Sequence, residues 1–280
     1  MTRNDPRPHH PHESGEAGGP VCHRLVGRTA VITGAGSGIG PASARRLADE
    51  GARVVCADID ETAGKAAAEA VGGLFVHTDV TDPAMVEALF DEAYETFGSV
   101  DVAFNNAGIP PMEDGSIPTT GPDARYRVQE VDPTSVLLCC RAVLPYMRRH
   151  GRGSIINTAS FVARTGAGTS QISYSASGGG VLAMSRELGV EFAREGIRVN
   201  ALSLGPVDTP LLRELLAADP ERAARRSAHI PLGRFARPEE IAAAVAFLAS
   251  DDSSFMTAGE FLVDGGISGA RVTPPHGPGA

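Results

Sequence analysis

Thr29-Ala30-Val31-Ile32-Thr33-Gly34-Ala35-Gly36-Ser37-Gly38-Ile39-Gly40 is an apolar, β-branched run that ends in closely spaced glycines and then enters a helical pattern. It predicts a strand, a tight turn and a helix. Glycine at Gly34, Gly38 and Gly40 permits a sharp turn and close backbone approach, and free N–H groups at a helix start attract phosphate. The stretch therefore predicts a site for the pyrophosphate of a dinucleotide, although a glycine-rich turn alone also fits an ordinary loop.

The next apolar run, Arg53–Ala57, is followed by Asp58. Asp58 lies at about the distance from the turn at which a carboxylate binds the ribose hydroxyls of NAD. The same charge repels the 2′-phosphate of NADP, and no arginine or lysine lies inside the turn or directly after Asp58 to pair with such a phosphate. These residues favour NAD as the cofactor.

Composition narrows the class of protein. The chain has 280 residues, 42% of them hydrophobic, and a formal charge of −9. This length supports one sizeable core, and the acidic balance disfavours a nucleic-acid partner. No apolar run approaches the ~20 residues of a membrane span, and no signal-peptide pattern is present at the N-terminus. We expect a cytoplasmic protein with no membrane partner, and the cysteines, which lack C-x-x-C spacing, predict no metal site.

Three regions differ in composition. Residues 1–24 are rich in proline, histidine, glycine and charge, which predicts a disordered tail, with its histidines solvated rather than bound to metal. Residues 25–270 are expected to form a single dinucleotide-binding and catalytic domain. Residues 271–280 are expected to form a second flexible tail. Inside the domain, the segment 207–230 contains an amphipathic, arginine- and alanine-rich stretch that we expect to act as a lid.

Strand and helix patterns alternate along the domain. They predict an α/β protein of the Rossmann type, with a doubly wound parallel sheet of about seven strands and helices on both faces. Pro133 removes a backbone N–H inside the helical region 123–150, so a kink is expected there. The expected strands are Thr29–Thr33, Arg53–Ala57, Leu74–His77, Val100–Phe104, Ser154–Thr158, Arg198–Ser203 and Phe261–Asp264, and the helices between them are Ala42–Glu50, Glu61–Val71, Pro83–Phe97, Asp123–His150, 173–194 and Pro238–Ser250.

Polar residues follow several of these strands, at the edge where ligands of open α/β sheets bind. Asp79 is placed to accept a hydrogen bond from an adenine amino group, but it fits a turn or helix-capping residue equally well. Asn105-Asn106-Ala107-Gly108 suits both backbone pairing and cofactor contact. Ser160 ends the fifth strand, and Tyr174 lies early in the following helix. No G-x-S-x-G motif surrounds Ser160, which argues against a hydrolase.

These motifs together resemble the short-chain dehydrogenase/reductase family over residues 24–270. The resemblance implies hydride transfer between nicotinamide and a carbon that bears a hydroxyl or carbonyl group, usually in a tetramer. It implies that Tyr174 exchanges the substrate proton and that Ser160 holds the substrate oxygen. The residues that carry the resemblance are Thr33-Gly34-x-x-x-Gly38-x-Gly40, Asp79-Val80, Asn105-Asn106-Ala107-Gly108, Ser160, Tyr174, Val199-Asn200-Ala201 and Val263-Asp264-Gly265-Gly266. The cofactor-binding residues are expected to be Gly34, Ser37, Gly38, Ile39, Gly40, Asp58, Ile59, Asp79, Val80, Asn106, Ala107, Gly108, Tyr174, Val207 and Thr209.

The chain departs from the family pattern at the proton relay. The family's lysine, four residues after the tyrosine, corresponds to Gly178, and its asparagine corresponds to Asp132. Residues 174 and 178 share a helix face. Loss of a positive charge about 5 Å away, at an effective dielectric near 20, forfeits ~3 kcal/mol of phenolate stabilisation, or roughly two pKa units. We expect the pKa of Tyr174 to lie near or above about 10, with Asp132 raising it further.

No other basic residue is an obvious replacement for the family's lysine. Lys65 is the only lysine and lies in the adenosine half, whereas Arg164 is the nearest basic residue in sequence between Ser160 and Gly178. Leu204 also departs from the family, which usually has proline there. The three glycines at 178–180 are expected to interrupt the helix, with close helix packing explaining two of them.

Three functions remain open. The first is an NAD-dependent oxidoreductase acting on a secondary alcohol or ketone, with Tyr174 as acid/base, Ser160 orienting the oxygen and Asp132 or a water replacing part of the relay. The second is a nucleotide-binding protein without redox turnover, serving as a partner subunit or sensor. The third is a dehydratase or isomerase that uses Tyr174 and Asp132 as acid and base. Met112, Ile117 and Leu212, in the loop 109–122 and the lid, suggest a moderately apolar small-molecule substrate.

Overall fold

The computed structural model describes residues 23–109, 114–166, 170–217 and 227–269. It contains a seven-stranded sheet of order β3-β2-β1-β4-β5-β6-β7, in which every neighbouring pair is parallel. This confirms the predicted doubly wound fold. The strands are β1 Thr29–Thr33, β2 Arg53–Asp58, β3 Leu74–His77, β4 Val102–Asn105, β5 Gly153–Ser160, β6 Ile197–Leu204 and β7 Glu260–Val263.

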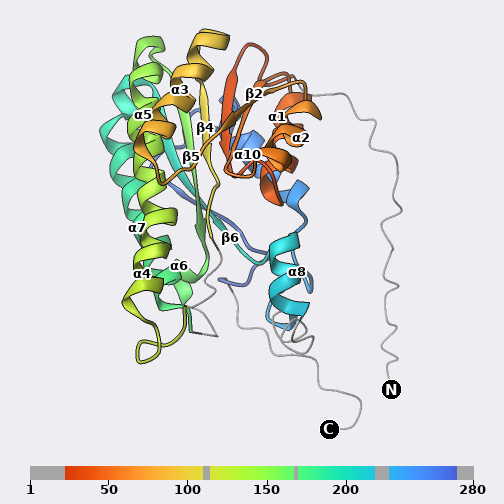
Figure 1. Ribbon diagram of the computed structural model, residues 1–280, viewed down its shortest axis with the longest axis vertical. Coiled ribbons are helices and arrows are strands. Elements are labelled where there is room, and N and C mark those ends of the chain that lie inside the picture. Colours follow the sequence, from red (N-terminus) through yellow and green to blue (C-terminus); the bar gives the residue numbers. More distant parts are fainter. Residues whose placement is uncertain (1–22, 110–113, 167–169, 218–226, 270–280) are drawn as a thin grey trace, which may run out of the picture.

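Helices cover both faces of the sheet. Figure 1 shows α3, α5 and α7 on one face and α1, α2 and α10 on the other. The strand order reverses between β1 and β4, and ligands of such sheets bind beyond the carboxyl ends of the strands at this point. The main helices are α1 Ile39–Asp49, α2 Glu61–Glu69, α3 Pro83–Phe97, α4 Pro122–Gln129, α5 Ser135–His150, α6 Val162–Thr165, α7 Ile172–Glu191, α8 Pro210–Ala217 and α10 Pro238–Ala249.

Each face of the sheet has its own hydrophobic core. On one side, Phe90 of α3 and Met147 of α5 are fully buried against the sheet. On the other side, Leu47 of α1 and Ile241 of α10 are fully buried in the same way. Burial of such a side chain contributes roughly 1.5–3 kcal/mol relative to exposure. The two cores hold the strand ends that carry the candidate site.

Capping residues determine the bounds of α3. The Asp82 carboxylate accepts hydrogen bonds from the N–H groups of Ala84 and Met85, and Pro83 occupies the first turn. Gly98 ends the helix with a φ of +75°, a conformation that glycine adopts without strain. These local signals explain why the predicted bounds of this helix are confirmed.

The region between α4 and α5 contains the kink that Pro133 predicts. Residues 130–134 form a π-helical turn, because proline cannot donate the backbone hydrogen bond that would continue the α-helix. The Thr134 hydroxyl donates to the carbonyl of Gln129 at 2.8 Å, and the Ser135 hydroxyl donates to the carbonyl of Asp132 at 3.0 Å. The wider turn places Asp132 at the junction of the two helices.

The glycines at 178–180 do not interrupt α7, and the prediction of a break there is wrong. The helix continues over 20 residues from Ile172 to Glu191. A Cβ on Gly178 would lie 3.0 Å from the Cβ of Ala163 in α6, whereas a Cβ on Gly179 would meet nothing within 4 Å and one on Gly180 only Pro133 at 3.8 Å. Close packing therefore explains one glycine and not two.

The ends of the chain and the lid lie partly outside the described residues. Arg24, at the end of the predicted N-terminal tail, pairs with Glu50 at 2.7 Å and with Asp252 at 2.8 Å. Of the predicted lid, α8 and residues 227–230 are described, and residues 218–226 are not. None of the helices in the described ranges is long and apolar enough to cross a bilayer.

Candidate active site at the carboxyl edge of the sheet

The glycine-rich turn joins β1 to α1 at the point where the strand order reverses. Gly34 and Gly38 have φ values of +64° and +61°, which side chains other than glycine rarely adopt. A Cβ on Gly40 would lie 2.1 Å from the carbonyl oxygen of Gly34. Among the described residues, no side chain caps the start of α1. The turn therefore presents a close backbone approach and uncapped helix N–H groups, which suit a pyrophosphate.

Asp58 lies directly beside this turn. One carboxylate oxygen accepts a hydrogen bond from the N–H of Gly36 at 2.7 Å, and the other accepts from the N–H of Asp60 at 2.9 Å. Ile59, the next residue, has an exposed side chain. A Cβ on Gly36 would come within 2.9 Å of the Asp58 carboxylate. The structure thus brings the predicted acid and the predicted phosphate turn together.

The amides after β4 hold the turn in place. The Asn106 side chain donates to the carbonyls of Thr33 and Gly34, both at 3.1 Å. The Thr33 hydroxyl accepts from the N–H groups of Asn106 and Ala107, also at 3.1 Å. A Cβ on Gly34 would lie 2.9 Å from the Cα of Ala107. Asn106 and Ala107 therefore position the glycine turn against β4, and a Cβ on Gly108 would lie 3.3 Å from a carboxylate oxygen of Asp132.

Asp79 and Val80 follow β3, where the sequence predicts contact with the adenine of the cofactor. One Asp79 oxygen accepts from the N–H of Thr81 at 2.9 Å and from its hydroxyl at 2.8 Å. Val80 is buried. The geometry shows Asp79 as a turn residue, one of its two predicted roles, and Asp82 rather than Asp79 caps α3.

Ser160 and Tyr174 meet although they belong to different elements. Ser160 ends β5, and Tyr174 lies in the first turn of α7. Burial raises the pKa of Tyr174 above its ordinary value, the Asp132 carboxylate raises it further, and a hydrogen bond with Ser160 lowers it. No basic side chain of the described residues contributes to this balance. The phenol therefore keeps its proton at neutral pH, and the Ser160 hydroxyl lies beside it.

Asp132 adjoins this pair. Its carboxylate accepts hydrogen bonds from the N–H of Ile109 at 3.2 Å and from the hydroxyl of Ser177 at 3.1 Å. Burial raises the pKa of Asp132 from 3.8 to about 6, and these two hydrogen bonds counter part of the rise. Ser177 was not among the predicted site residues, because only the packing of α7 against the π-helical turn brings it to Asp132. The result is a carboxyl group with a pKa of about 6, well above the ordinary value.

We expect Asp132→Asn to stabilise the fold in a pH-dependent way. The raised pKa of Asp132 favours folding below about 3.8, and this contribution is lost as pH rises through about 6. About two pKa units correspond to at most ~3 kcal/mol. The difference in free energy of unfolding between Asp132→Asn and wild type, measured by urea denaturation, should rise in favour of the variant between pH 4 and pH 8. Asp123→Asn, at an exposed position in α4, is the matched control variant.

Arg164 and Lys65, the basic residues that could replace the family's lysine, pair with other side chains. Arg164 pairs with Glu260 at 3.5 Å, and Glu260 also accepts from the hydroxyl of Ser203 at 2.9 Å. Lys65 pairs with Glu61 at 2.6 Å on the exposed side of α2. In residues 23–109, 114–166, 170–217 and 227–269, neither side chain pairs with Tyr174.

Val207 and Thr209 connect the site to the lid. Val207 pairs with Ala236 in an isolated parallel bridge, which anchors the segment before α8. The Thr209 hydroxyl accepts from the N–H of Leu212 at 3.2 Å, and a Cβ on Gly38 would lie 3.0 Å from the Thr209 methyl group. The start of α8 therefore lies against the glycine turn (Figure 1). The predicted pocket residue Met112 lies outside the described residues, whereas Ile117 is exposed.

The sheet order and the glycine turn define a Rossmann-type nucleotide-binding fold. A family model described as enoyl-(acyl carrier protein) reductase matches residues 34–268. The chain is 44% identical over 249 residues to cis-4-hydroxycyclohexanecarboxylate dehydrogenase from Sinomonas cyclohexanicum, with 86% of this chain and 96% of that protein covered. It is 37% identical to meso-2,3-butanediol dehydrogenase from Serratia marcescens, with 90% and 98% covered.

A solved structure shows the same architecture. The crystal structure of levodione reductase superposes with a TM-score of 0.83 at 36% identity, covering 88% of this chain and all of that one. The chain belongs to the short-chain dehydrogenase/reductase family, whose dehydrogenases bind NAD or NADP. The resemblance inferred from the motifs is confirmed at this level.

Proposed function

We propose that this protein is an NAD(H)-dependent oxidoreductase that transfers a hydride between nicotinamide and the carbon of a secondary alcohol or ketone. One observation carries the proposal. The Ser160 side chain and the Tyr174 phenol, which interact, lie at the same edge of the sheet as a glycine turn with an acid beside it. Such a turn and acid suit a dinucleotide, and a serine with a protonated tyrosine suits a carbonyl oxygen.

The residues have separate tasks in this proposal. The glycine turn and Asp58 hold the cofactor, which when bound supplies or accepts the hydride. Ser160 orients the substrate oxygen by a hydrogen bond. Tyr174 donates a proton to that oxygen during reduction and accepts it during oxidation. Because the pKa of Tyr174 is raised, ketone reduction is favoured over alcohol oxidation at neutral pH.

The direct test follows the absorbance of the nicotinamide band. Purified protein is mixed with NADH or NADPH and a series of ketones, and in the reverse direction with NAD or NADP and alcohols. Cyclic six-membered substrates head the series, because two relatives are named for a hydroxycyclohexanecarboxylate and for levodione. NADH-dependent reduction supports the proposal, and cofactor binding without any turnover contradicts it.

Asp58 is proposed to select NAD. We expect Asp58→Ala to weaken NADH binding by about 10–100-fold and to move the preference toward NADPH, because the carboxylate that accepts from Gly36 and repels a 2′-phosphate is lost. Nicotinamide fluorescence titrations with both cofactors measure the change. Asp49→Ala, at the exposed end of α1, should leave both affinities unchanged. An unaltered ratio of NADH to NADPH affinity in Asp58→Ala would refute the assignment.

We also propose that Gly178 occupies the family's lysine position and Asp132 its asparagine position. Gly178 lies one turn after Tyr174 on α7. A Cβ added at Gly178 would lie 3.9 Å from the backbone nitrogen of Ser160. The family resemblance further supports a homotetramer, which light scattering in solution tests.

A second function is favoured by one specific feature. Asp132, with a pKa raised to about 6, lies beside a protonated tyrosine, which is how an acid and base pair for dehydration or isomerisation is arranged. A non-redox conversion lost in Asp132→Asn, in protein that shows no change in the nicotinamide band, would select this function over the first. Cofactor binding without either reaction would select a sensor or partner subunit.

A further inference from the structure

The segment 114–120 packs against the first turn of α7, the helix that carries Tyr174. The Asp114 carboxylate accepts hydrogen bonds from the N–H groups of Ser173 at 3.1 Å and Tyr174 at 2.9 Å. The N–H of Ile172 donates to the carbonyl of Gly115 at 3.2 Å. Three successive N–H groups of the helix start are therefore satisfied by two residues that lie about 60 positions earlier in the chain.

The helix has no cap of its own at this end. Gln171 precedes α7 with φ −157° and ψ 68°, and its side chain makes no capping hydrogen bond. The first N–H groups of a helix need acceptors from outside the helix, and a carboxylate there also interacts favourably with the helix dipole. Asp114 supplies both effects from another part of the chain.

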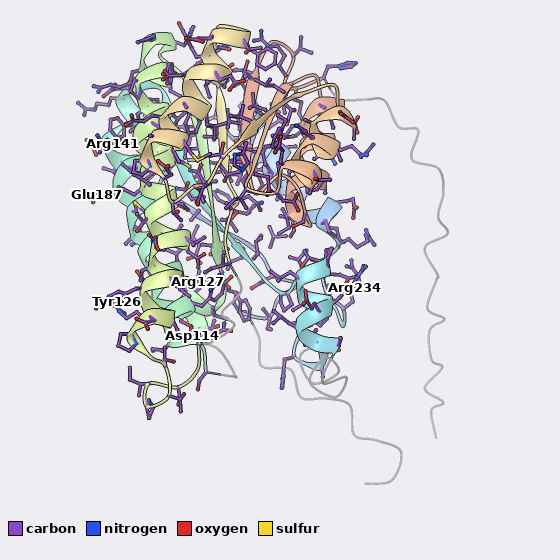
Figure 2. The ribbon with its side chains drawn as sticks, in the orientation of Figure 1. Asp114, Tyr126, Arg127, Arg141, Glu187 and Arg234 are labelled. Carbon is purple, nitrogen blue, oxygen red and sulfur yellow. The ribbon has the colours of Figure 1, made fainter. Side chains whose placement is uncertain are left out.

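The carboxylate is itself held in place. The Thr120 hydroxyl donates to Asp114 at 3.2 Å and accepts from the N–H of Gly115 at 2.8 Å. The N–H groups of Thr119 and Thr120 both donate to the carbonyl of Ser116 at 2.9 Å. The segment is thus a compact, internally bonded loop. Figure 2 shows Asp114 at the same end of the molecule as Tyr126 and Arg127 of α4.

We propose that Asp114 is a positioning residue for Tyr174. It acts through the backbone, because it binds the N–H of Tyr174 itself and of the residue before it. The phenol must stay beside Ser160 to reach a substrate oxygen, and a frayed first turn would release it. This inference rests on the proposed function. It adds that the loop after β4 holds the proton donor in place, in addition to any role in lining the pocket.

The test compares Asp114→Ala with Asp114→Asn. Alanine removes both acceptors, whereas asparagine keeps one oxygen that can accept. Loss of a helix cap corresponds to roughly a 5- to 30-fold increase in the equilibrium constant for opening the first turn of the helix. We expect kcat to fall about tenfold in Asp114→Ala and to recover in part in Asp114→Asn, while the KM for the cofactor stays within about twofold of wild type. Asp123→Ala, a nearby exposed carboxylate on α4, is the matched control.

Hydrogen exchange gives a readout that does not depend on activity. In Asp114→Ala, peptides covering residues 172–177 should exchange roughly 5- to 30-fold faster, and peptides covering 183–191 should be unchanged. Wild-type kcat in Asp114→Ala, or a fall in kcat with no change in exchange at 172–177, would overturn the proposal. Absence of turnover in the wild-type protein would instead refute the proposed function, and the exchange result would still decide whether Asp114 caps α7.

Discussion

Tyr174→Phe is expected to lower turnover by about 10²–10⁴-fold, because it removes the group that we propose exchanges a proton with the substrate oxygen. Ser160 would then hold the oxygen with no donor beside it. Steady-state rates with saturating cofactor and substrate measure the loss. Cofactor affinity should stay within a few fold of wild type, since the glycine turn and Asp58 are untouched.

The control for this variant is Tyr126→Phe. Tyr126 lies on α4 with 67% of its surface exposed, so loss of its hydroxyl should change neither turnover nor binding. If Tyr174→Phe kept the wild-type rate, the phenol would not be the proton donor. If it lost cofactor binding as well as activity, Tyr174 would be needed for the cofactor site rather than for proton exchange alone.

Gly178→Lys is expected to raise the rate of alcohol oxidation near neutral pH by about 10–100-fold. A positive charge about 5 Å from the phenol stabilises the phenolate by ~3 kcal/mol at an effective dielectric near 20, which corresponds to roughly two pKa units. The pH profile for oxidation should therefore move toward lower pH. Reduction should change less, because a protonated tyrosine already serves it.

The added side chain must fit beside α6. A Cβ at position 178 would lie 3.0 Å from the Cβ of Ala163, so the two helices must separate by a few tenths of an ångström. Gly178→Ala makes the same contact without the charge and is the matched control. The double variant Gly178→Lys with Asp132→Asn also removes the carboxylate that raises the pKa of Tyr174. Rates in Gly178→Lys equal to those in Gly178→Ala would show that the missing charge does not limit oxidation.

Much of the fold follows from local patterns. β1, β3 and α3 have the predicted bounds, because apolar strand runs, an N-capping Asp82 and a C-terminal Gly98 act over a few residues. Other bounds shift by one to three residues at their ends. The one wrong prediction within a helix concerns residues 178–180, where packing of α7 on its neighbours outweighs the low helix propensity of glycine.

The candidate site was predictable where it depends on strand ends. Parallel strands bring their carboxyl ends to one edge, so the positions of Asp58 and Ser160 at strand ends predict that both lie at the edge of the glycine turn. Asp114 and Ser177 were missed. No local motif marks either residue, since the partners of Asp114 lie about 60 positions away and the partner of Ser177 lies 45 positions away.

The amino-acid sequence by itself determined the order of strands and helices, the glycine turn and the acid that follows β2, because each depends on residue types at short spacing. The pairing of Ser160 with Tyr174 was implied by the family resemblance. Only the tertiary structure decided that Arg164 pairs with Glu260 rather than with Tyr174, that burial brings the pKa of Asp132 to about 6, and that Asp114 caps α7. Desolvation and side-chain partners depend on which distant segments pack together, and that arrangement exists only once the chain has folded.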